Sequence, residues 1–327
     1  MVSRALVLVM GLIMGASAAA QTPPPPLVLE AKIPLGPISA RIDHLAIDLK
    51  RQRLFVAELG NDSLGIVDLV AGKVLRTLTG LSEPQGVGYE PTTDTVHVAN
   101  AGDGSVRILR GDDLATVGRI DLGDDADNVR IDADRKRVLV GYGAGALAIL
   151  DPTTKTKVAD IRLKAHPESF QIDGDRAFVN VPDAQLIEVA DLARGEVVGA
   201  WPTQPNHSNF PMAIDRDAHR LLVVFRSPAR LMIISAADGS AVGSLDTCGD
   251  ADDVSVDRKR HRVYVTCGAG VIEVFEDFAG SYRRIGQIPT VSGARTSLFV
   301  PEMDRLFVAV RSSGNEPAAI WVFSPAS

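Results

Sequence analysis

The sequence predicts an all-β fold, a single seven-bladed β-propeller with four antiparallel strands in each blade. A hairpin-like unit recurs along the chain at steps of 42, 42, 41, 42, 42 and 44 residues. Each hairpin is followed by a third apolar run, and six of the seven third runs are followed by a fourth. Four strands per repeat of about 40–45 residues is typical of a propeller blade.

The hairpin unit is clearest in the sixth repeat, where 252–267 reads DDVSVDRKRHRVYVTC. Two alternating apolar runs are joined by a charged turn, which is the pattern of a β-hairpin. The first run ends at an acidic residue, which we call the stop residue. The stop residues of the seven repeats are Asp48, Glu90, Asp132, Asp173, Asp215, Asp257 and, in the last repeat, Pro301.

The third runs extend from LGIVDL (64–69) in the first repeat to AIWVF (319–323) in the last. No fourth run follows 319–323. An extra apolar run, LVLEAKIPL (27–35), precedes the first hairpin instead. We therefore expect this N-terminal strand to complete the last blade and close the ring, which removes the open sheet edges that would promote aggregation.

Two segments precede the propeller, which we assign to residues 27–327. Residues 1–20 have the features of a signal peptide: Arg4, the apolar run ALVLVMGLIM, and a small-residue cleavage pattern ending at Ala20. This run is shorter than the roughly 20 apolar residues that span a bilayer. Residues 21–26 form a Pro-rich spacer with no expected packing of its own. We expect a periplasmic or secreted protein without a membrane span after cleavage.

The composition restricts the partners. The formal net charge is −7 and no Lys/Arg run exceeds three residues, so we expect no nucleic-acid partner. The chain has no CxxCH haem motif and no nucleotide-binding loop. We expect a monomer whose partner is a small polar ligand or another protein.

Two repeat segments, VHVAN (96–100) and VYVTC (263–267), resemble the Tyr-Val-Thr-Asn signature of the YVTN-repeat, YncE-like propellers. The resemblance covers essentially all of the chain after Pro26 and implies the propeller fold. Propellers of this broad class include exported binding proteins, heavy subunits of periplasmic dehydrogenases and a few metal-dependent lyases. Fold alone does not choose among these functions.

The repeat changes character at one end of the innermost strand. One and three residues before the stop residue, all fourteen positions are apolar. Five residues before it stand Asp43, Gln85, Asp127, Glu168, Phe210, Asp252 and Thr296, and all of these except Phe210 are polar. In a closed ring these positions surround the central funnel. Nearby segments add Arg41, His44, Asn128, His166, His207, Asn209, Asp253 and Arg295.

Three functions fit this polar ring. The first is an exported binding protein whose funnel recognises a small polar ligand or divalent cation, through Arg41, Asp43, Gln85, Asp127, Asn128, Glu168, Asn209, Asp252, Asp253 and Arg295. The second is a metal-dependent enzyme of lyase or hydrolase type, with His44, His166 and His207 holding a divalent metal ion. The third is a scaffold that docks another protein.

One segment, HPESF (166–170), places Glu168 two residues after His166. A carboxylate beside a histidine can act as an acid/base pair, so these two are the candidate catalytic residues. A salt-bridged loop is the alternative.

The two cysteines, Cys248 and Cys267, lie at the funnel end of neighbouring strands in the sixth repeat. We predict a disulfide, worth roughly 3 kcal/mol for a loop of this length; two free thiols are the alternative.

Overall fold

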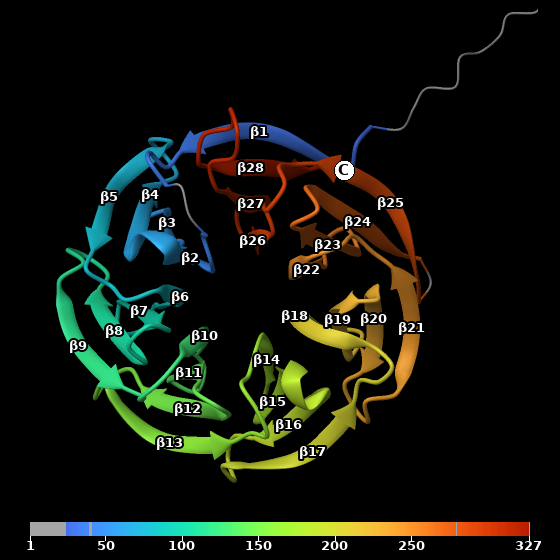
Figure 1. Cartoon of the computed structure of the whole chain (residues 1–327), viewed down its shortest axis with the longest axis horizontal. Helices are drawn as coiled ribbons and strands as arrows, with labels where there is room; N and C mark the ends of the chain where they lie inside the picture. Colours follow the sequence, from blue (N-terminus) through green and yellow to red (C-terminus); the bar gives the residue numbers. More distant parts are fainter. Residues whose placement is uncertain (1–23, 39–40, 279, 327) are drawn as a thin grey trace, which may run out of the picture.

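The computed structural model describes residues 24–38, 41–278 and 280–326. Within these residues, 28 strands form seven four-stranded antiparallel sheets arranged as blades around a central axis (Figure 1). The predicted fold class is confirmed. The predicted signal peptide and residues 21–23 of the spacer lie outside the described residues.

The first four blades follow one another along the chain, each running from the axis outward. Blade 1 contains β2 (Leu45–Asp48), β3 (Arg53–Glu58), β4 (Ser63–Asp68) and β5 (Lys73–Thr79). Blade 2 contains β6 (Pro84–Glu90), β7 (Thr95–Asn100), β8 (Ser105–Arg110) and β9 (Thr116–Asp121). Blade 3 contains β10 (Ala126–Asp132), β11 (Arg137–Tyr142), β12 (Ala146–Asp151) and β13 (Thr156–Arg162). Blade 4 contains β14 (Phe170–Asp173), β15 (Arg176–Val181), β16 (Leu186–Asp191) and β17 (Glu196–Pro202).

The remaining blades keep the same order, except that the last one takes its outer strand from the N-terminus. Blade 5 contains β18 (His207–Asp215), β19 (Arg220–Ser227), β20 (Ala229–Ser235) and β21 (Ala241–Asp246). Blade 6 contains β22 (Ala251–Asp257), β23 (Arg262–Cys267), β24 (Val271–Phe278) and β25 (Ser281–Pro289). Blade 7 contains β26 (Thr296–Val300), β27 (Arg305–Val310), β28 (Ala319–Pro325) and β1 (Leu27–Pro34).

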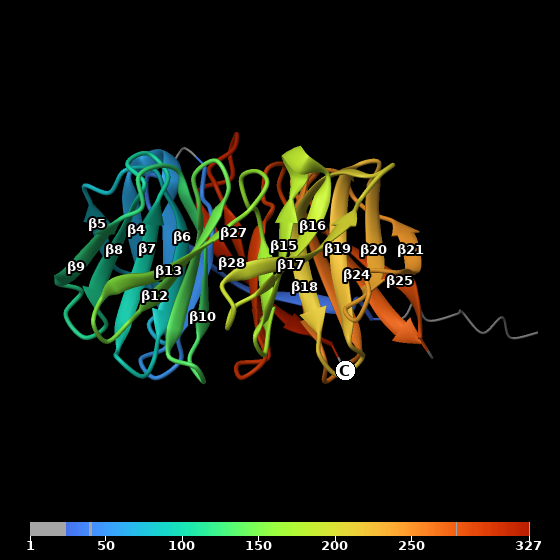
Figure 2. The same cartoon turned by 90° about the horizontal axis from the view of Figure 1, so that it is seen from below.

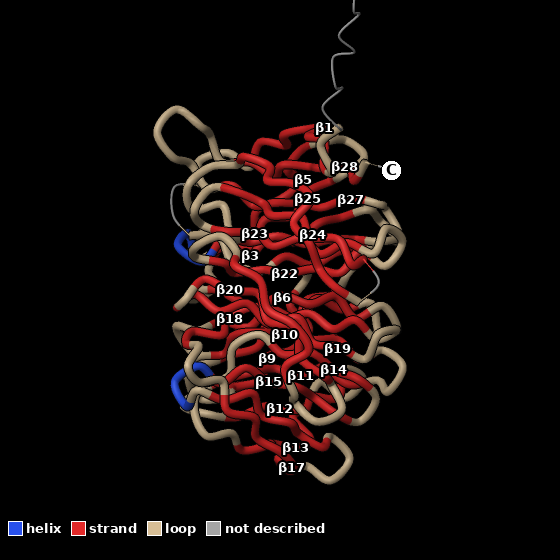
Figure 3. The backbone as a smooth tube through the Cα atoms, turned by 90° about the vertical axis from the view of Figure 1, so that its right-hand side faces the viewer, coloured by secondary structure: helices blue, strands red, loops and turns tan. Residues whose placement is uncertain are grey.

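The helical content is limited to two short 3₁₀ turns, η1 (Leu59–Asn61) and η2 (Pro182–Ala184), in the part of the chain that the structure describes. Both lie on the face where the innermost strands begin (Figures 2 and 3). No helix within the described ranges is long and apolar enough to cross a membrane.

The apolar core lies between the blades rather than within them. Seven buried clusters occur in the described residues, and each combines side chains from two neighbouring blades. In the cluster at the closure, Val56 of blade 1 packs with Phe307 and Ile320 of blade 7. Because each blade covers only one side of a cluster, the core is complete only in the closed ring.

The ring closes as the sequence predicts, because β1 pairs antiparallel with β28. One detail of the spacer differs from the expectation. Pro26 is buried, and its carbonyl oxygen accepts a hydrogen bond from the Ala326 amide at 3.0 Å. The spacer therefore packs at its last residue, because this residue caps the β1–β28 pair.

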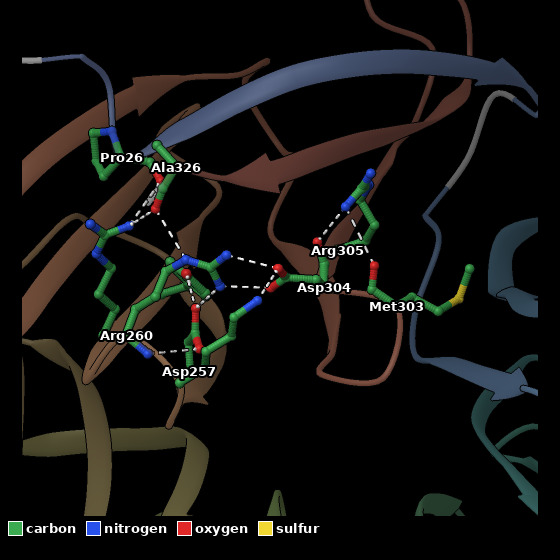
Figure 4. Close-up of polar contacts among 10 residues, drawn as sticks. Pro26, Asp257, Arg260, Met303, Asp304, Arg305 and Ala326 are labelled. Carbon is green, nitrogen blue, oxygen red and sulfur yellow. Dashed lines mark hydrogen bonds and ion pairs between the residues drawn. The ribbon is translucent and has the colours of Figure 1, made fainter.

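Two arginines of blade 6 contact the residue that follows β28 at this closure (Figure 4). Arg260 donates to the carbonyl oxygen of Ala326 at 3.1 Å and forms ion pairs with Asp257 at 3.0 Å and Asp304 at 2.6 Å. Arg262 donates to the same Ala326 oxygen at 2.6 Å. Arg260 thus links its own stop residue, the hairpin turn of blade 7 and the end of β28.

Candidate functional site

The innermost strands carry a recurrent irregularity where they enter the ring. In blade 1, the Asp43 amide donates to Ala57 O at 2.8 Å, and the Ala57 amide donates to His44 O at 3.1 Å. Two residues therefore face one residue of the neighbouring strand, which is the arrangement of a β-bulge. Blade 4 has the same pattern, with Glu168 and Ser169 opposite Asn180. Register shifts occur at the same position in blades 2, 3, 5 and 6.

The bulge explains why the polar ring lies on the axis. One and three residues before the stop residue, side chains pack between blades, as Val129 and Ile131 do. The bulge interrupts this alternation, since it shifts the strand by one residue. As a result, five of the seven residues five positions before the stop residue line a cavity at the funnel entrance: Gln85, Asp127, Glu168, Phe210 and Asp252.

This cavity, which we call the mouth cavity, has a volume of about 260 Å³. Six of the predicted ligand-binding residues line it: Arg41, Gln85, Asp127, Glu168, Asp252 and Arg295. The other lining residues are Asp125, His166, Phe210 and Arg226.

One side of the mouth cavity combines carboxyl groups with His166. The His166 Nδ1 lies 2.7 Å from Gly143 O and 3.4 Å from Asp125 Oδ2, and its Nε2 lies 3.9 Å from Asp127 Oδ2. Burial lowers the pKa of His166, but its interactions with Asp127, Gly143 and Asp125 outweigh this effect and raise the pKa to about 9. His166 is therefore an imidazolium at neutral pH.

Asp127 and Glu168 have opposite protonation behaviour in this setting. Burial raises the pKa of Asp127, but His166, His44 and Arg41 outweigh it and the net shift is downward. Burial, followed by the charges of Asp127 and Asp252, raises the pKa of Glu168 to about 8. At neutral pH the cavity therefore holds an ionised Asp127 and a largely protonated Glu168.

Neither carboxyl group is satisfied by the protein. Asp127 is only 6% exposed, and its Oδ1 atom has no hydrogen-bond partner among the described residues. The Glu168 side chain, which is half-buried, also forms no hydrogen bond to any residue that the structure describes. An unpaired buried oxygen is costly, and in native proteins it usually has a partner.

The opposite side of the mouth cavity is an arginine–aspartate network. Arg226 and Arg295 both form ion pairs with Asp252, and the Arg295–Asp252 distance is 3.1 Å. Both arginines also approach Asp250 Oδ1, Arg226 at 3.4 Å and Arg295 at 2.8 Å. The guanidinium carbon of Arg226 lies 4.1 Å from the ring centre of Phe210, a cation–π contact. Phe210, the one apolar member of the predicted ring, thus orients an arginine.

A second polar layer lies beneath the mouth cavity. Asp43 is 2% exposed and pairs with Arg41 and, at 3.2 Å, with His44 Nδ1. His44 Nε2 lies 2.8 Å from Asn128 Oδ1. Burial raises the pKa of Asp43 to about 6 even though His44 and Arg41 oppose the shift. Asp253 accepts a hydrogen bond from the Ser297 amide at 2.7 Å.

This layer separates the mouth cavity from an inner channel of about 340 Å³, lined in part by His44, Arg130, Gln171 and Asp253. Asp43, Asn128 and Asp253, predicted as ligand-binding residues, therefore lie behind the mouth cavity and support it.

Two other predicted residues are placed away from the mouth cavity. Asn209 is buried and donates to Asn180 Oδ1 at 3.0 Å and Leu186 O at 3.1 Å, so its contacts are structural. His207 begins β18 with an exposed side chain and lines neither the mouth cavity nor the inner channel.

The predicted metal triad of His44, His166 and His207 is not assembled. No group of three or more His, Cys, Asp or Glu side chains is arranged to hold a metal ion in residues 24–38, 41–278 and 280–326. His44 is held by Asp43 and Asn128, and His166 by Gly143 and its aspartates. Spacing along the repeat places residues around the axis but does not determine where their side chains converge.

The candidate catalytic pair is also separated in its contacts. His166 interacts with Asp125 and Asp127, and no hydrogen bond or ion pair joins it to Glu168 within the described part of the chain. The predicted disulfide between Cys248 and Cys267 is present, with the Cα atoms 5.9 Å apart.

Several residues of the site were missed by the sequence analysis. Asp125 and Asp250 occupy the position seven residues before the stop residue, where Arg41 and His166 also lie, so the repeat itself contained a signal for them. Arg226 is on the second strand of its blade, outside the positions that were compared. Arg130 has the opposite parity to the packing column and points into the channel.

No family model matches this chain, and no curated protein matches it. Among solved structures, the chain is similar to one from "Crystal Structure of Mitotic Checkpoint Complex", with a TM-score of 0.78 and 13% sequence identity. The match covers 97% of this chain and 98% of that chain. At this identity the likeness shows the propeller fold alone.

Proposed function

We propose that this propeller is a binding protein that recognises a small polar ligand in the mouth cavity through a cationic, hydrogen-bond-donating group such as an ammonium. The observation that carries this proposal is Asp127: a buried, ionised carboxylate with one oxygen unpaired, at the wall of an open cavity. A cationic donor bound in the cavity would pair with this carboxylate through a charge-assisted hydrogen bond.

Glu168 supports the same ligand class. Its carboxyl group faces the cavity, and its proton is retained partly because of the negative charges of Asp127 and Asp252. A cation bound between these groups offsets that repulsion, so Glu168 would ionise as the ligand binds. Binding of a cationic group is therefore expected to release a proton near neutral pH.

The proposal is tested by thermal unfolding of the wild-type protein in the presence of alkylamines, diamines, amino acids, simple carboxylates and neutral polyols. Ligands that bind the native state raise the melting temperature. We expect the stabilising compounds to be those with an ammonium group, and Asp127→Asn to abolish their effect. The matched control is Asp112→Asn, an exposed residue after β8 on the opposite face.

Stabilisation by polyols or carboxylates alone, an unchanged response in Asp127→Asn, or no stabilising compound would each contradict the proposal. The last result would favour the docking-scaffold alternative. The structural neighbour from the mitotic checkpoint complex supports that alternative only in general terms, since that chain belongs to a protein assembly.

We further infer that the chain is exported and related to the YVTN-repeat propellers. The signal-peptide features of residues 1–20 and the Cys248–Cys267 disulfide support export, because disulfides persist in oxidising compartments. The segments VHVAN and VYVTC support the relationship. Export is tested by mass spectrometry of the mature protein. Cleavage of the signal peptide after Ala20 predicts a mature chain that begins at Gln21.

A further inference from the structure

A small side pocket opens beside the mouth cavity at the junction of blades 6, 7 and 1. It has a volume of about 80 Å³ and includes Arg41, Arg295 and Arg311 with Asp250 and Gly293. Arg41 and Arg295 line the mouth cavity as well, so the two spaces are neighbours. Since a water molecule occupies about 30 Å³ in the liquid, this pocket has room for a group the size of a carboxylate or phosphate.

The side pocket is rich in positive charge. Three guanidinium groups line it, against the single carboxylate of Asp250. Arg295 and Arg41 already pair with aspartates, whereas Arg311 forms no ion pair or hydrogen bond with any described residue. Like charges around one small space repel each other, and a bound anion would offset that repulsion.

Gly293 gives Arg311 its place in the pocket. The glycine has φ +85°, and a Cβ atom there would lie 2.7 Å from Nη2 and 2.8 Å from Nε of Arg311. Any side chain at this position would therefore displace the guanidinium group. The planar guanidinium presents parallel N–H donors that match the two oxygens of a carboxylate or the oxygens of a phosphate.

We propose that the side pocket binds an anionic group, a carboxylate or a phosphate, of the same ligand whose cationic group binds at Asp127, so that the ligand is a small zwitterion. This inference rests on the proposed function for its cationic half. Arg311 supplies a positive charge that no described residue pairs, while Arg41 and Arg295 border both spaces and lie between the two ends of the ligand.

The test compares matched probes by isothermal titration calorimetry. The zwitterions are linear ω-amino carboxylates of increasing chain length and their ω-aminoalkyl phosphate counterparts. The references are alkylamines and alkyl carboxylates of the same lengths. We expect at least one zwitterion length to bind the wild type more than tenfold tighter than the amine of that length, and the series to show whether a carboxylate or a phosphate is preferred.

Substitutions assign the two halves separately. Arg311→Gln is expected to weaken the best zwitterion by about tenfold or more, the usual loss for a hydrogen bond to a charged group, and to leave the amine unchanged. Gly293→Ala should act in the same direction because it displaces Arg311. Arg194→Gln, a surface residue paired with Glu196, is the control. Unfolding without probes verifies that each variant is folded.

The outcomes distinguish the two proposals. Equal binding of amine and zwitterion to the wild type, or an equal loss for both probes in Arg311→Gln, overturns the anion site and leaves the cation site intact. Binding of the zwitterions that depends on Arg311 but not on Asp127 overturns the cation site and retains the anion site. If no probe binds, both fail.

Discussion

At the scale of single residues, the site depends on two carboxyl groups of the same wall with different neighbours. Asp127 has His166 and His44 nearby, and these charges keep it ionised despite burial. Glu168 has burial and two negative neighbours, which raise its pKa to about 8. The two carboxyl groups have similar pKa values in water, and their different surroundings separate them. Asp127 is ionised and accepts hydrogen bonds, whereas Glu168 retains its proton at neutral pH.

The raised pKa of Glu168 gives a pH-dependent stability. Because the folded pKa is above the unfolded value, the native state holds this proton more tightly, and its contribution to the free energy of unfolding falls as pH rises from about 4.5 to about 8. The glutamine of the Glu168→Gln variant cannot ionise, so the variant lacks this decrease of the free energy of unfolding with pH. The decrease is at most about 1.4 kcal/mol per pH unit. Urea unfolding from pH 5 to 9 should show the variant gaining on the wild type as pH rises. A constant difference across this range would contradict the pKa shift.

At the scale of elements, the sequence predicted the strands better than the directions of their side chains. The period-two pattern around each stop residue identified β2, β6, β10 and their counterparts, because alternation is a property of the strand itself. The bulge at their entrance depends on pairing with the second strand, which a single strand does not encode. The strand pattern therefore did not show which of the three histidines would face one another. Arg130 was missed for a different reason, since it lies on the opposite face of the strand from the packing column.

Hairpin turns supply a further interaction that the strand pattern did not reveal. Arg51 links its stop residue Asp48, at 2.8 Å, to Asp94 of blade 2, at 2.6 Å. Arg260 makes the equivalent link between Asp257 and Asp304 (Figure 4). The acidic stop residue thus ends the first strand and also holds an arginine that reaches the next blade.

Replacing Arg260 should cost much more stability than replacing a surface arginine. Arg260→Ala removes two ion pairs and leaves Asp257, which is 1% exposed, with less compensation, so we expect a loss of about 3 kcal/mol. Arg110→Ala is the control, because its pair with Asp113 is exposed and should contribute little to stability. Chemical denaturation measures both. Equal losses would show that the Arg260 link is no stronger than a surface ion pair.

At the scale of the whole molecule, the closed ring was predictable because it follows from the number of strands in the sequence. Seven third strands, six fourth strands and one extra strand at Leu27–Pro34 leave a single arrangement without an open edge. The mouth cavity was predictable to the same extent, since closure brings Asp127 of blade 3 and Asp252 of blade 6 around one axis. The side pocket was not, because Arg311 lies beyond the last repeated hairpin and Gly293 precedes it.

Closure also predicts how the two ends of the chain contribute to stability. Within β1 and the residue after it, Leu27, Ile33 and Leu35 are each 5% exposed or less. Burial of one such side chain is worth about 1.5–3 kcal/mol, so removing three approaches the total stability of a typical domain, about 5–15 kcal/mol. A chain that begins after Leu35 should aggregate or melt at a much lower temperature, since the edge of β28 is then unpaired.

A chain that begins at Pro26 should match the full-length protein, because Pro26 is the first buried residue of the described part of the chain. A synthetic peptide of residues 26–35 should restore part of the lost melting temperature. If the two truncated chains melt alike, the pairing of β1 with β28 does not hold the ring together.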